Sequence, residues 1–206
     1  MGPQRHWQSR GRGRRDRLGV DGFLIALLLV FALATGGRDQ RMVAQWASAL
    51  HRSPALLVVA ALSACLSAGA MAWVGAEFAA LLPRRAAQML VAFALAVAAI
   101  ELALPVRLTS PQEPTRSLGA LFVVLLARQV GDGARFAVFA LSAWTVVPLT
   151  AGLGGALGGA AAVTLGWSVG SASLARWPLT KLRWGLAACL AVAALFVGLD
   201  ARFAAA

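Results

Sequence analysis

The sequence predicts an all-α integral membrane protein, with six transmembrane helices arranged as two inverted three-helix repeats. Three observations lead to this prediction: the composition is 60% hydrophobic and only 13% charged, the apolar runs are long enough to cross a bilayer, and a polar interruption occurs twice. A segment in lipid must satisfy its backbone polar groups internally, so these continuous Ala/Leu/Val runs are expected to be helices. A transmembrane barrel would instead show alternating strands of about ten residues.

The apolar runs fall into two groups of three. They cover residues 18–50 (with a polar interruption inside), 55–82, 86–104, 118–143, 146–174 and 182–199. We expect repeat 1 to occupy residues 18–104 and repeat 2 to occupy residues 118–206. The segment 105–117 between them contains three prolines, which break the helical pattern, so it is predicted to be a linker.

A basic segment, residues 1–17, precedes the first span. It holds six of the 19 basic residues and few apolar ones, so it is predicted to be a disordered tail. Arginines beside a first span hold that side in the cytoplasm, which explains part of the net charge of +11 without a nucleic-acid partner. Contact with anionic lipid or nucleic acid is one alternative. A cleaved export signal ending near Ala34 is another, although cleavage would remove half of one repeat.

The polar interruption occurs once in each group, at Thr35–Arg41 and at Gln129–Arg135. Superposing the two regions at an offset of 94 residues also aligns residue types that compositional bias rarely pairs. These pairs are Gly37 with Gly131, Arg41 with Arg135, Pro54 with Pro148 and Trp73 with Trp167. The chain is therefore predicted to be two copies of one unit. Because each copy has an odd number of spans, the second enters the membrane upside down, and such inverted repeats place a substrate site near the midplane between the copies.

The interruptions place charged residues at the predicted depth of the membrane. They are Arg38, Asp39, Asp132 and Arg135. A charge at that depth is costly unless it is paired or lines a water-filled cavity, so these residues mark a candidate site. A glycine beside an aspartate suits a locally unwound helix, whose free carbonyls can coordinate a cation. The alternative is that both interruptions are simply helix ends.

The two motifs resemble those of the cation/proton antiporters that include the Golgi transmembrane protein 165 of animals and bacterial and chloroplast manganese exporters. Members of that family have two three-helix repeats, and the first helix of each carries Glu-x-Gly-Asp-(Lys/Arg)-(Ser/Thr). The resemblance extends over about residues 20–200. In its register, Gly37 and Gly131 are the motif glycines and Asp132 is the retained aspartate.

The chain departs from that pattern at three of the four acidic positions. Thr35 and Gln129 stand in place of the two glutamates, and Arg38 stands in place of the first aspartate. The resemblance implies exchange of a divalent cation, manganese or calcium, for protons, with oxygen ligands from both repeats. The candidate ion ligands in this chain are Asp132, Gln129, Thr35 and Asp39. Of these, Asp132 and Asp39 are the metal-binding candidates.

Arg38 has two interpretations. If the repeat brings the interruptions together, its guanidinium would lie near Asp132 and occupy the place of the transported cation. Alternatively, Arg38 pairs locally with Asp39 at a membrane interface.

Two further acidic residues, Glu77 and Glu101, lie near the ends of predicted spans. Either could relay protons, or it could reach to the membrane interface instead. The fifth span carries glycines four residues apart, at 154/158 and 155/159, a spacing that allows close helix approach. These glycines form either a static packing face or a sliding surface for alternating access.

Two functions from different classes remain open. The first is a divalent cation/proton antiporter; the second is a divergent paralogue that keeps the fold but not the ion site, as an accessory membrane subunit. An exporter of another solute is a third. An enzyme is not expected, because the sequence has no nucleophile with its base, no metal-ligand cluster and no phosphate-binding loop, and no cofactor is expected either.

The expected surroundings are a lipid bilayer, namely a bacterial cytoplasmic membrane with the amino terminus on the cytoplasmic side. A bacterial origin is suggested by the preference for Arg over a single Lys and by the high Ala content, as in GC-rich genomes. The oligomeric state is not fixed by the sequence, and a homo-oligomer is one option.

Overall fold

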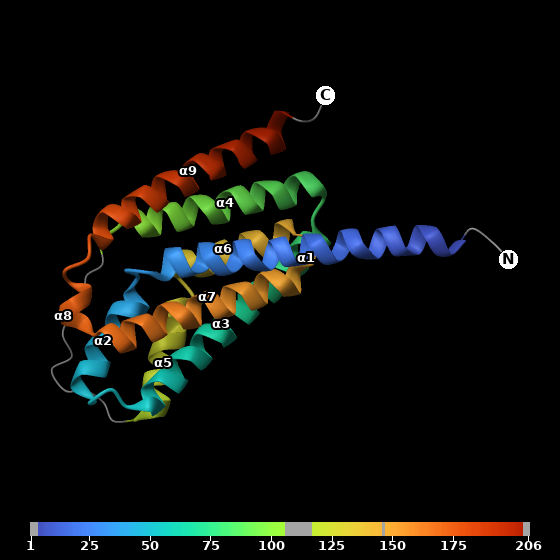
Figure 1. Cartoon of the computed structure of the whole chain (residues 1–206). Helices are drawn as coiled ribbons and strands as arrows, with labels where there is room; N and C mark the ends of the chain where they lie inside the picture. Colours follow the sequence, from blue (N-terminus) through green and yellow to red (C-terminus); the bar gives the residue numbers. More distant parts are fainter. Residues whose placement is uncertain (1–3, 106–116, 146, 204–206) are drawn as a thin grey trace.

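The structure is a computed structural model that describes residues 4–105, 117–145 and 147–203, with side chains from residue 19 onward. Within these ranges every element is a helix, which confirms the all-α prediction. The helices are α1 (Gln4–Ala34), α2 (Arg38–Ala49), α3 (Pro54–Leu81), α4 (Arg84–Ala103), α5 (Leu118–Gln129), α6 (Gly133–Trp144), α7 (Pro148–Val169), α8 (Ser171–Leu174) and α9 (Leu179–Phe203). Figure 1 shows them as a bundle of long helices, with the short α2 and α8 gathered at one end.

The helix boundaries follow local sequence signals. Helices α3 and α7 begin at Pro54 and Pro148, and a proline in the first helical turn lacks only an N–H that would have no partner there anyway. Each predicted polar interruption separates two helices, α1 from α2 and α5 from α6. The predicted linker 105–117 starts where α4 ends, and its residues 106–116 lie outside the described residues.

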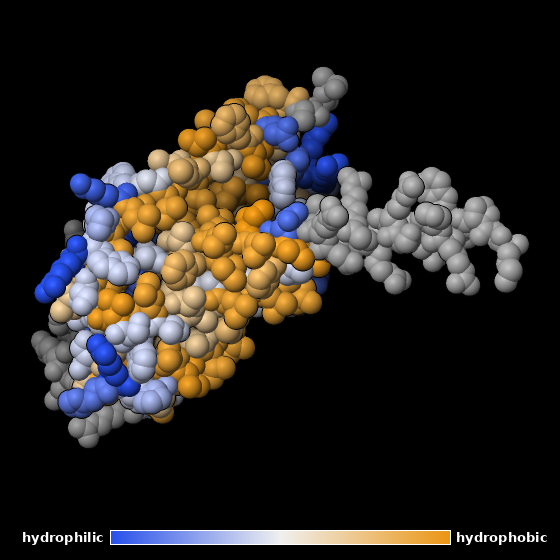
Figure 2. Space-filling model, viewed as in Figure 1, coloured by the Kyte–Doolittle hydropathy of each residue, from blue (hydrophilic) through white to orange (hydrophobic). Residues whose placement is uncertain are grey.

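Length and composition are consistent with an integral membrane protein, with four or five candidate spans among the described helices. Helices α3, α4, α7 and α9 are each long and apolar enough to cross a bilayer. Residues 19–34 of α1 together with α2 form a fifth candidate, which bends by 63° at the break. Large apolar side chains on the outer surface support a lipid-facing role. Leu28, Leu66, Phe93, Leu153 and Phe196 are each more than half exposed, and Figure 2 shows a broad apolar surface with polar residues concentrated toward the ends.

Helix α1 begins at Gln4 and runs without interruption through the basic segment into the apolar one, while the disorder of residues 1–17 stays a prediction. Two physical effects favour this extension. Gln and Arg are good helix formers, and a helix already nucleated in the apolar segment gains one hydrogen bond for each residue that it adds. Figure 1 shows this part of α1 projecting beyond the bundle.

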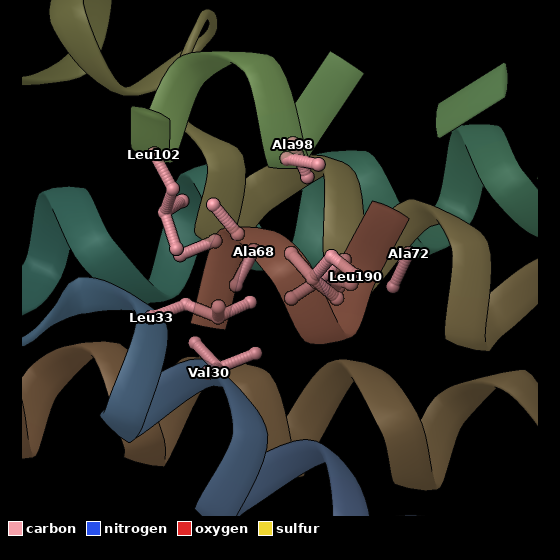
Figure 3. Packing of buried hydrophobic residues seen from close by; sticks show 12 residues of the cluster. Val30, Leu33, Ala68, Ala72, Ala98, Leu102 and Leu190 are labelled. Carbon is pink, nitrogen blue, oxygen red and sulfur yellow. The ribbon is translucent and has the colours of Figure 1, made fainter. Parts of the chain in front are cut away.

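The core is formed by small and aliphatic side chains from helices far apart in the sequence. Helix α1 packs on α7, α7 packs on α3, α4 packs on α9, and α6 lies against both α3 and α4. In Figure 3, Val30 and Leu33 of α1 face Ala68 of α3, Leu102 of α4 and Leu190 of α9. The alanines leave room for the helices to approach closely.

The glycines of α7 form two packing faces. A Cβ on Gly158 would lie 2.5 Å from the carbonyl oxygen of Leu27, and one on Gly154 would collide with the carbonyl oxygen of Phe23, so this pair makes room for α1. A Cβ on Gly155 would lie 2.5 Å from Val138, on α6. The predicted glycine spacing therefore serves contacts with two different helices.

Candidate functional site

The first break, residues 35–37, joins α1 to α2 and is stabilised by hydrogen bonds with a buried glutamine. Gly36 has a φ of +77°, a conformation that a residue with a side chain rarely adopts. The side-chain oxygen of Gln40 accepts a hydrogen bond from the Gly36 N–H at 2.7 Å, and its Nε2 donates to the carbonyl of Ala162 on α7 at 3.0 Å. Gln40 thus satisfies a backbone group released by the break and ties that break to the second half of the chain.

The second break, residues 130–132, joins α5 to α6 and is tied to the first half of the chain. The side-chain oxygen of Gln129 accepts from the Ser67 hydroxyl at 2.6 Å, and its Nε2 donates to the Ser63 hydroxyl at 3.2 Å. Arg135 donates from Nε to Ser67 at 2.6 Å. Both serines lie on α3, so each break is held by a long helix from the opposite half.

The two breaks bring acidic side chains from the two halves into one charged group. Asp39, just inside α2, lies close enough to Asp132, Arg135 and the Gln129 amide for these groups to act on its carboxylate. Asp39 and Arg135 are buried, and Asp132 is partly exposed. We call these four residues, Asp39, Gln129, Asp132 and Arg135, the break junction.

Arg135 is the cation of the break junction. It is 2% exposed, and its charge acts on both aspartates. Its guanidinium fits because position 159 is a glycine: a Cβ there would lie 3.1 Å from Nη1. Nη1 has no hydrogen-bond partner among the described residues. The Arg135 guanidinium forms no ion pair with either aspartate among the described residues, so its charge compensates theirs from a longer distance.

A second charged group lies beside the break junction, around Glu101 near the end of α4. Its Oε1 lies 3.6 Å from Arg38 Nε and 3.5 Å from Arg183 Nη2. Its Oε2 accepts a hydrogen bond from the Gly133 N–H, the first residue of α6, at 3.3 Å. We call Arg38, Glu101 and Arg183 the Glu101 cluster. Its charges also reach Asp132, on which both Glu101 and Arg183 act.

Together the two groups contain equal numbers of acidic and basic side chains. The acids are Asp39, Glu101 and Asp132, and the bases are Arg38, Arg135 and Arg183. If all six are ionised, the site is electrically balanced without any bound ion. A cation that enters this balanced group would add a net positive charge to it.

The structure places the predicted site residues in different surroundings. Thr35 is buried, but its hydroxyl donates within its own helix, to the Phe31 carbonyl at 2.7 Å. Gly37 is the residue before α2, and a Cβ there would lie 2.9 Å from the Ala34 carbonyl oxygen. A Cβ on Gly131 would meet nothing within 4 Å. The glycine that the second break needs is Gly133, whose Cβ would lie 2.5 Å from Leu102.

The other three predicted residues, Arg38, Glu77 and Glu101, also differ in their surroundings. Arg38 pairs with Glu101, and neither Asp39 nor Asp132 forms an ion pair with it among the described residues. Glu101 is 7% exposed and central to the site. Glu77 is exposed near the end of α3. Figure 1 shows that this end lies opposite the end that carries α2 and α8.

The sequence analysis missed several residues that hold the site together. Ser63 and Ser67 are two hydroxyls four residues apart in an apolar helix, so they share one face, and this spacing could have identified them. No comparable spacing in the sequence indicated Gln40 or Arg183. Arg183 lies in the first turns of α9, where a basic residue ordinarily indicates the end of a span.

The site offers few ligands for a hard metal ion. In the described part of the chain, no group of three or more His, Cys, Asp or Glu side chains is placed to hold one. The break junction offers two carboxylates and the Gln129 amide, with an arginine among them. The positive charge of Arg135 acts on both carboxylates and disfavours a second cation beside them.

Comparison with known proteins gives no assignment. No protein-family model matches the chain, and no curated protein or solved structure is significantly similar to it.

Proposed function

We propose that this chain is a membrane transporter of the cation/proton antiporter type, with its ion site at the break junction. The observation that carries the proposal is the meeting of Asp39 and Asp132, which come from breaks in opposite halves of the chain. Helices broken near their middle, with ionisable groups at the break, are characteristic of ion sites in secondary transporters. The substrate class, manganese or calcium, rests on the sequence resemblance.

The proposal includes six spans in two inverted repeats. The first half runs as a broken helix (α1–α2) and two long helices (α3, α4), and the second half runs as a broken helix (α5–α6) and two long helices (α7, α9). The helix contacts also cross between the halves. Helix α2 of the first half packs on α7 of the second, and α6 of the second half packs on α3 of the first. We take α5 and α6 together as the second broken span, which gives each half three spans and opposite orientations.

In the proposed mechanism, Arg135 is the resident cation of the empty site. A substrate cation binds when the Arg135 side chain moves away from Asp39 and Asp132, and the two carboxylates with Gln129 then supply oxygen ligands. Protons compete for the same carboxylates, so binding of protons on one side of the membrane favours release of the cation. Glu101 lies next to Asp132 and is the residue through which protons reach the junction.

The alternative function is a non-transporting paralogue that serves as an accessory membrane subunit. The balance of three carboxylates by three guanidiniums favours it, because the site needs no bound ion for charge compensation. In that case the breaks are structural and Arg135 never leaves the aspartates.

A flux assay separates the two functions. The purified chain is reconstituted in liposomes, and uptake of Mn²⁺ and of Ca²⁺ is measured with and without a pH gradient. For the antiporter we expect proton-coupled flux that Asp39→Asn and Asp132→Asn each abolish. Asp200→Asn is the matched control, because Asp200 is an exposed aspartate on α9. Absence of flux under every gradient, in a chain that is folded, would support the accessory subunit.

A further inference from the structure

A cavity of about 400 Å³ lies where α4 ends and α9 begins. It is lined by Arg41 of α2, by the last residues of α4 with Leu104 and Pro105, and by Thr180, Arg183 and Trp184. It is bordered by two arginines, and its described lining contains no carboxylate. The break junction is not part of this lining.

The two arginines carry a positive charge that the proposed ion site does not use. Arg41 lies close enough to Arg183 for their like charges to interact. Arg183 shares Glu101 with Arg38, whereas no described carboxylate forms an ion pair with Arg41. The break junction and the Glu101 cluster are already balanced, so Arg41 adds an uncompensated charge at the cavity.

Both guanidiniums also have N–H groups without a partner. Arg183 is 3% exposed, and it uses Nη2 for Glu101 while its Nη1 has no hydrogen-bond partner among the described residues. The Nε of Arg41 is likewise buried and unpartnered within the described part of the chain. A buried, unsatisfied donor is costly, and a charged one more so. An acceptor with several negative oxygens would satisfy both donors and neutralise the excess charge.

We propose that the Arg41–Arg183 cavity binds a phosphate-type oxyanion. Guanidinium groups match the oxygen geometry of phosphate and hold it with charge-assisted hydrogen bonds. Thr180 adds a hydroxyl that can donate to the same anion. A cation is disfavoured here by the two like charges.

The same chemistry has two sources, a lipid headgroup and free phosphate. Trp184 is 59% exposed and Leu104 is 51% exposed, so apolar side chains surround the basic cavity. Aromatic and basic residues together are typical of the headgroup level of a membrane. The site does not depend on transport, since binding can be measured where no flux occurs.

Binding is tested on the purified full-length chain in detergent and in lipid nanodiscs. The first measurement titrates inorganic phosphate and follows the thermal unfolding midpoint and the ³¹P line width. The second compares nanodiscs of phosphatidylcholine alone with nanodiscs that also contain phosphatidylglycerol, again by the unfolding midpoint. Phosphate that raises the midpoint and broadens the line identifies a free anion as ligand. Stabilisation by phosphatidylglycerol alone identifies a lipid headgroup.

Variants connect the effect to the cavity. Arg41→Gln removes a charged donor and is expected to weaken binding about tenfold or more, as the loss of a charge-assisted hydrogen bond implies. Arg176→Gln is the matched control, because it removes the same charge from an exposed position that does not line the cavity. If Arg41→Gln fails to fold, Arg41→Lys retains the charge and is expected to bind more weakly than the wild type. Absence of any effect of either ligand on the wild type would overturn the proposal, and so would equal losses in Arg41→Gln and Arg176→Gln.

Discussion

The two breaks are equivalent in sequence position, but their polar side chains are held differently. At the first break the group that ties the break to the opposite half is neutral: Gln40 bridges Gly36 and Ala162, while Arg38 is directed to Glu101 with its side chain 45% exposed. At the second break Gln129 shares this task with a charged side chain, since Arg135 donates to Ser67 and its charge acts on Asp39 and Asp132. Each break therefore contributes one aspartate, and the second also supplies a buried cation.

The largest expected difference in stability between the breaks comes from Arg41 and Arg135, the two arginines that the repeat aligns. Arg135→Met removes a buried charge near two aspartates and the 2.6 Å hydrogen bond to Ser67, and it is expected to lower the free energy of unfolding by about 3 kcal/mol. Arg41→Met, at the equivalent position, removes a partly exposed side chain whose Nε has no partner among the described residues, and it is expected to cost less than about 1 kcal/mol. Reversible unfolding in mixed detergent micelles measures both. Equal losses would contradict the difference drawn between the breaks.

The next effect concerns the glycines of α7 that face each break. A Cβ at position 166 would lie 2.6 Å from the Gln40 carbonyl oxygen, which is backbone and cannot yield. Gly166→Ala is thus expected to cost about 2 kcal/mol by overpacking. A Cβ at position 159 meets only the end of the Arg135 side chain, so Gly159→Ala is expected to cost less. Unfolding midpoints of the two variants, with Gly69→Ala as a control in open space, test this order.

The two buried glutamines give a smaller effect. Gln129→Leu removes partners from Ser63, Ser67 and Asp39, and is expected to cost about 2 kcal/mol. Gln40→Leu frees one backbone N–H and weakens one link to α7, and is expected to cost about 1 kcal/mol, because single hydrogen bonds within membrane proteins are weak. Denaturation of the two variants under identical conditions gives the ratio of their losses in free energy of unfolding. A larger loss for Gln40→Leu would reverse the assignment of roles.

The smallest effect is expected at Arg38. Its side chain is half-exposed, and Glu101 keeps Arg183 as a partner when Arg38 is removed. Arg38→Gln is therefore expected to change the free energy of unfolding by less than about 1 kcal/mol. Its flux in the liposome assay is expected to remain near that of the wild type. A loss of flux as complete as that of Asp132→Asn would show that Arg38, and not Arg135, is the internal cation.

Much of the fold could be predicted from the sequence, because membrane helices are determined by local composition. The apolar runs predicted the long helices to within a few residues in most cases, and α3 and α7 begin at the prolines that the repeat aligns. The disorder of the basic tail stays a prediction, beside a helix that begins at Gln4. Six spans and an inverted repeat remain predictions.

The candidate site was predicted less well, because side-chain partners depend on contacts between distant helices. The sequence identified Asp39, Gln129 and Asp132 as candidates, and these three lie together. It assigned Arg38 to Asp132 or Asp39, and the structure places it beside Glu101. It did not select Ser67 or Arg183, whose partners are 62 and 82 residues away in the chain, although the spacing of Ser63 and Ser67 indicates one polar face of α3.

The sequence by itself determined that this protein is helical, belongs in a membrane and breaks two of its helices at charged motifs. These properties follow from hydropathy and from the conformational freedom of glycine, which act over a few residues. Only the tertiary structure decided that the charge of Arg135 acts on both aspartates, that Arg38 and Arg183 pair with Glu101, and that Arg41 lines a cavity without a carboxylate partner among the described residues. At low dielectric the pairing of charges depends on distances of a few ångströms, and the packing of helices alone sets those distances.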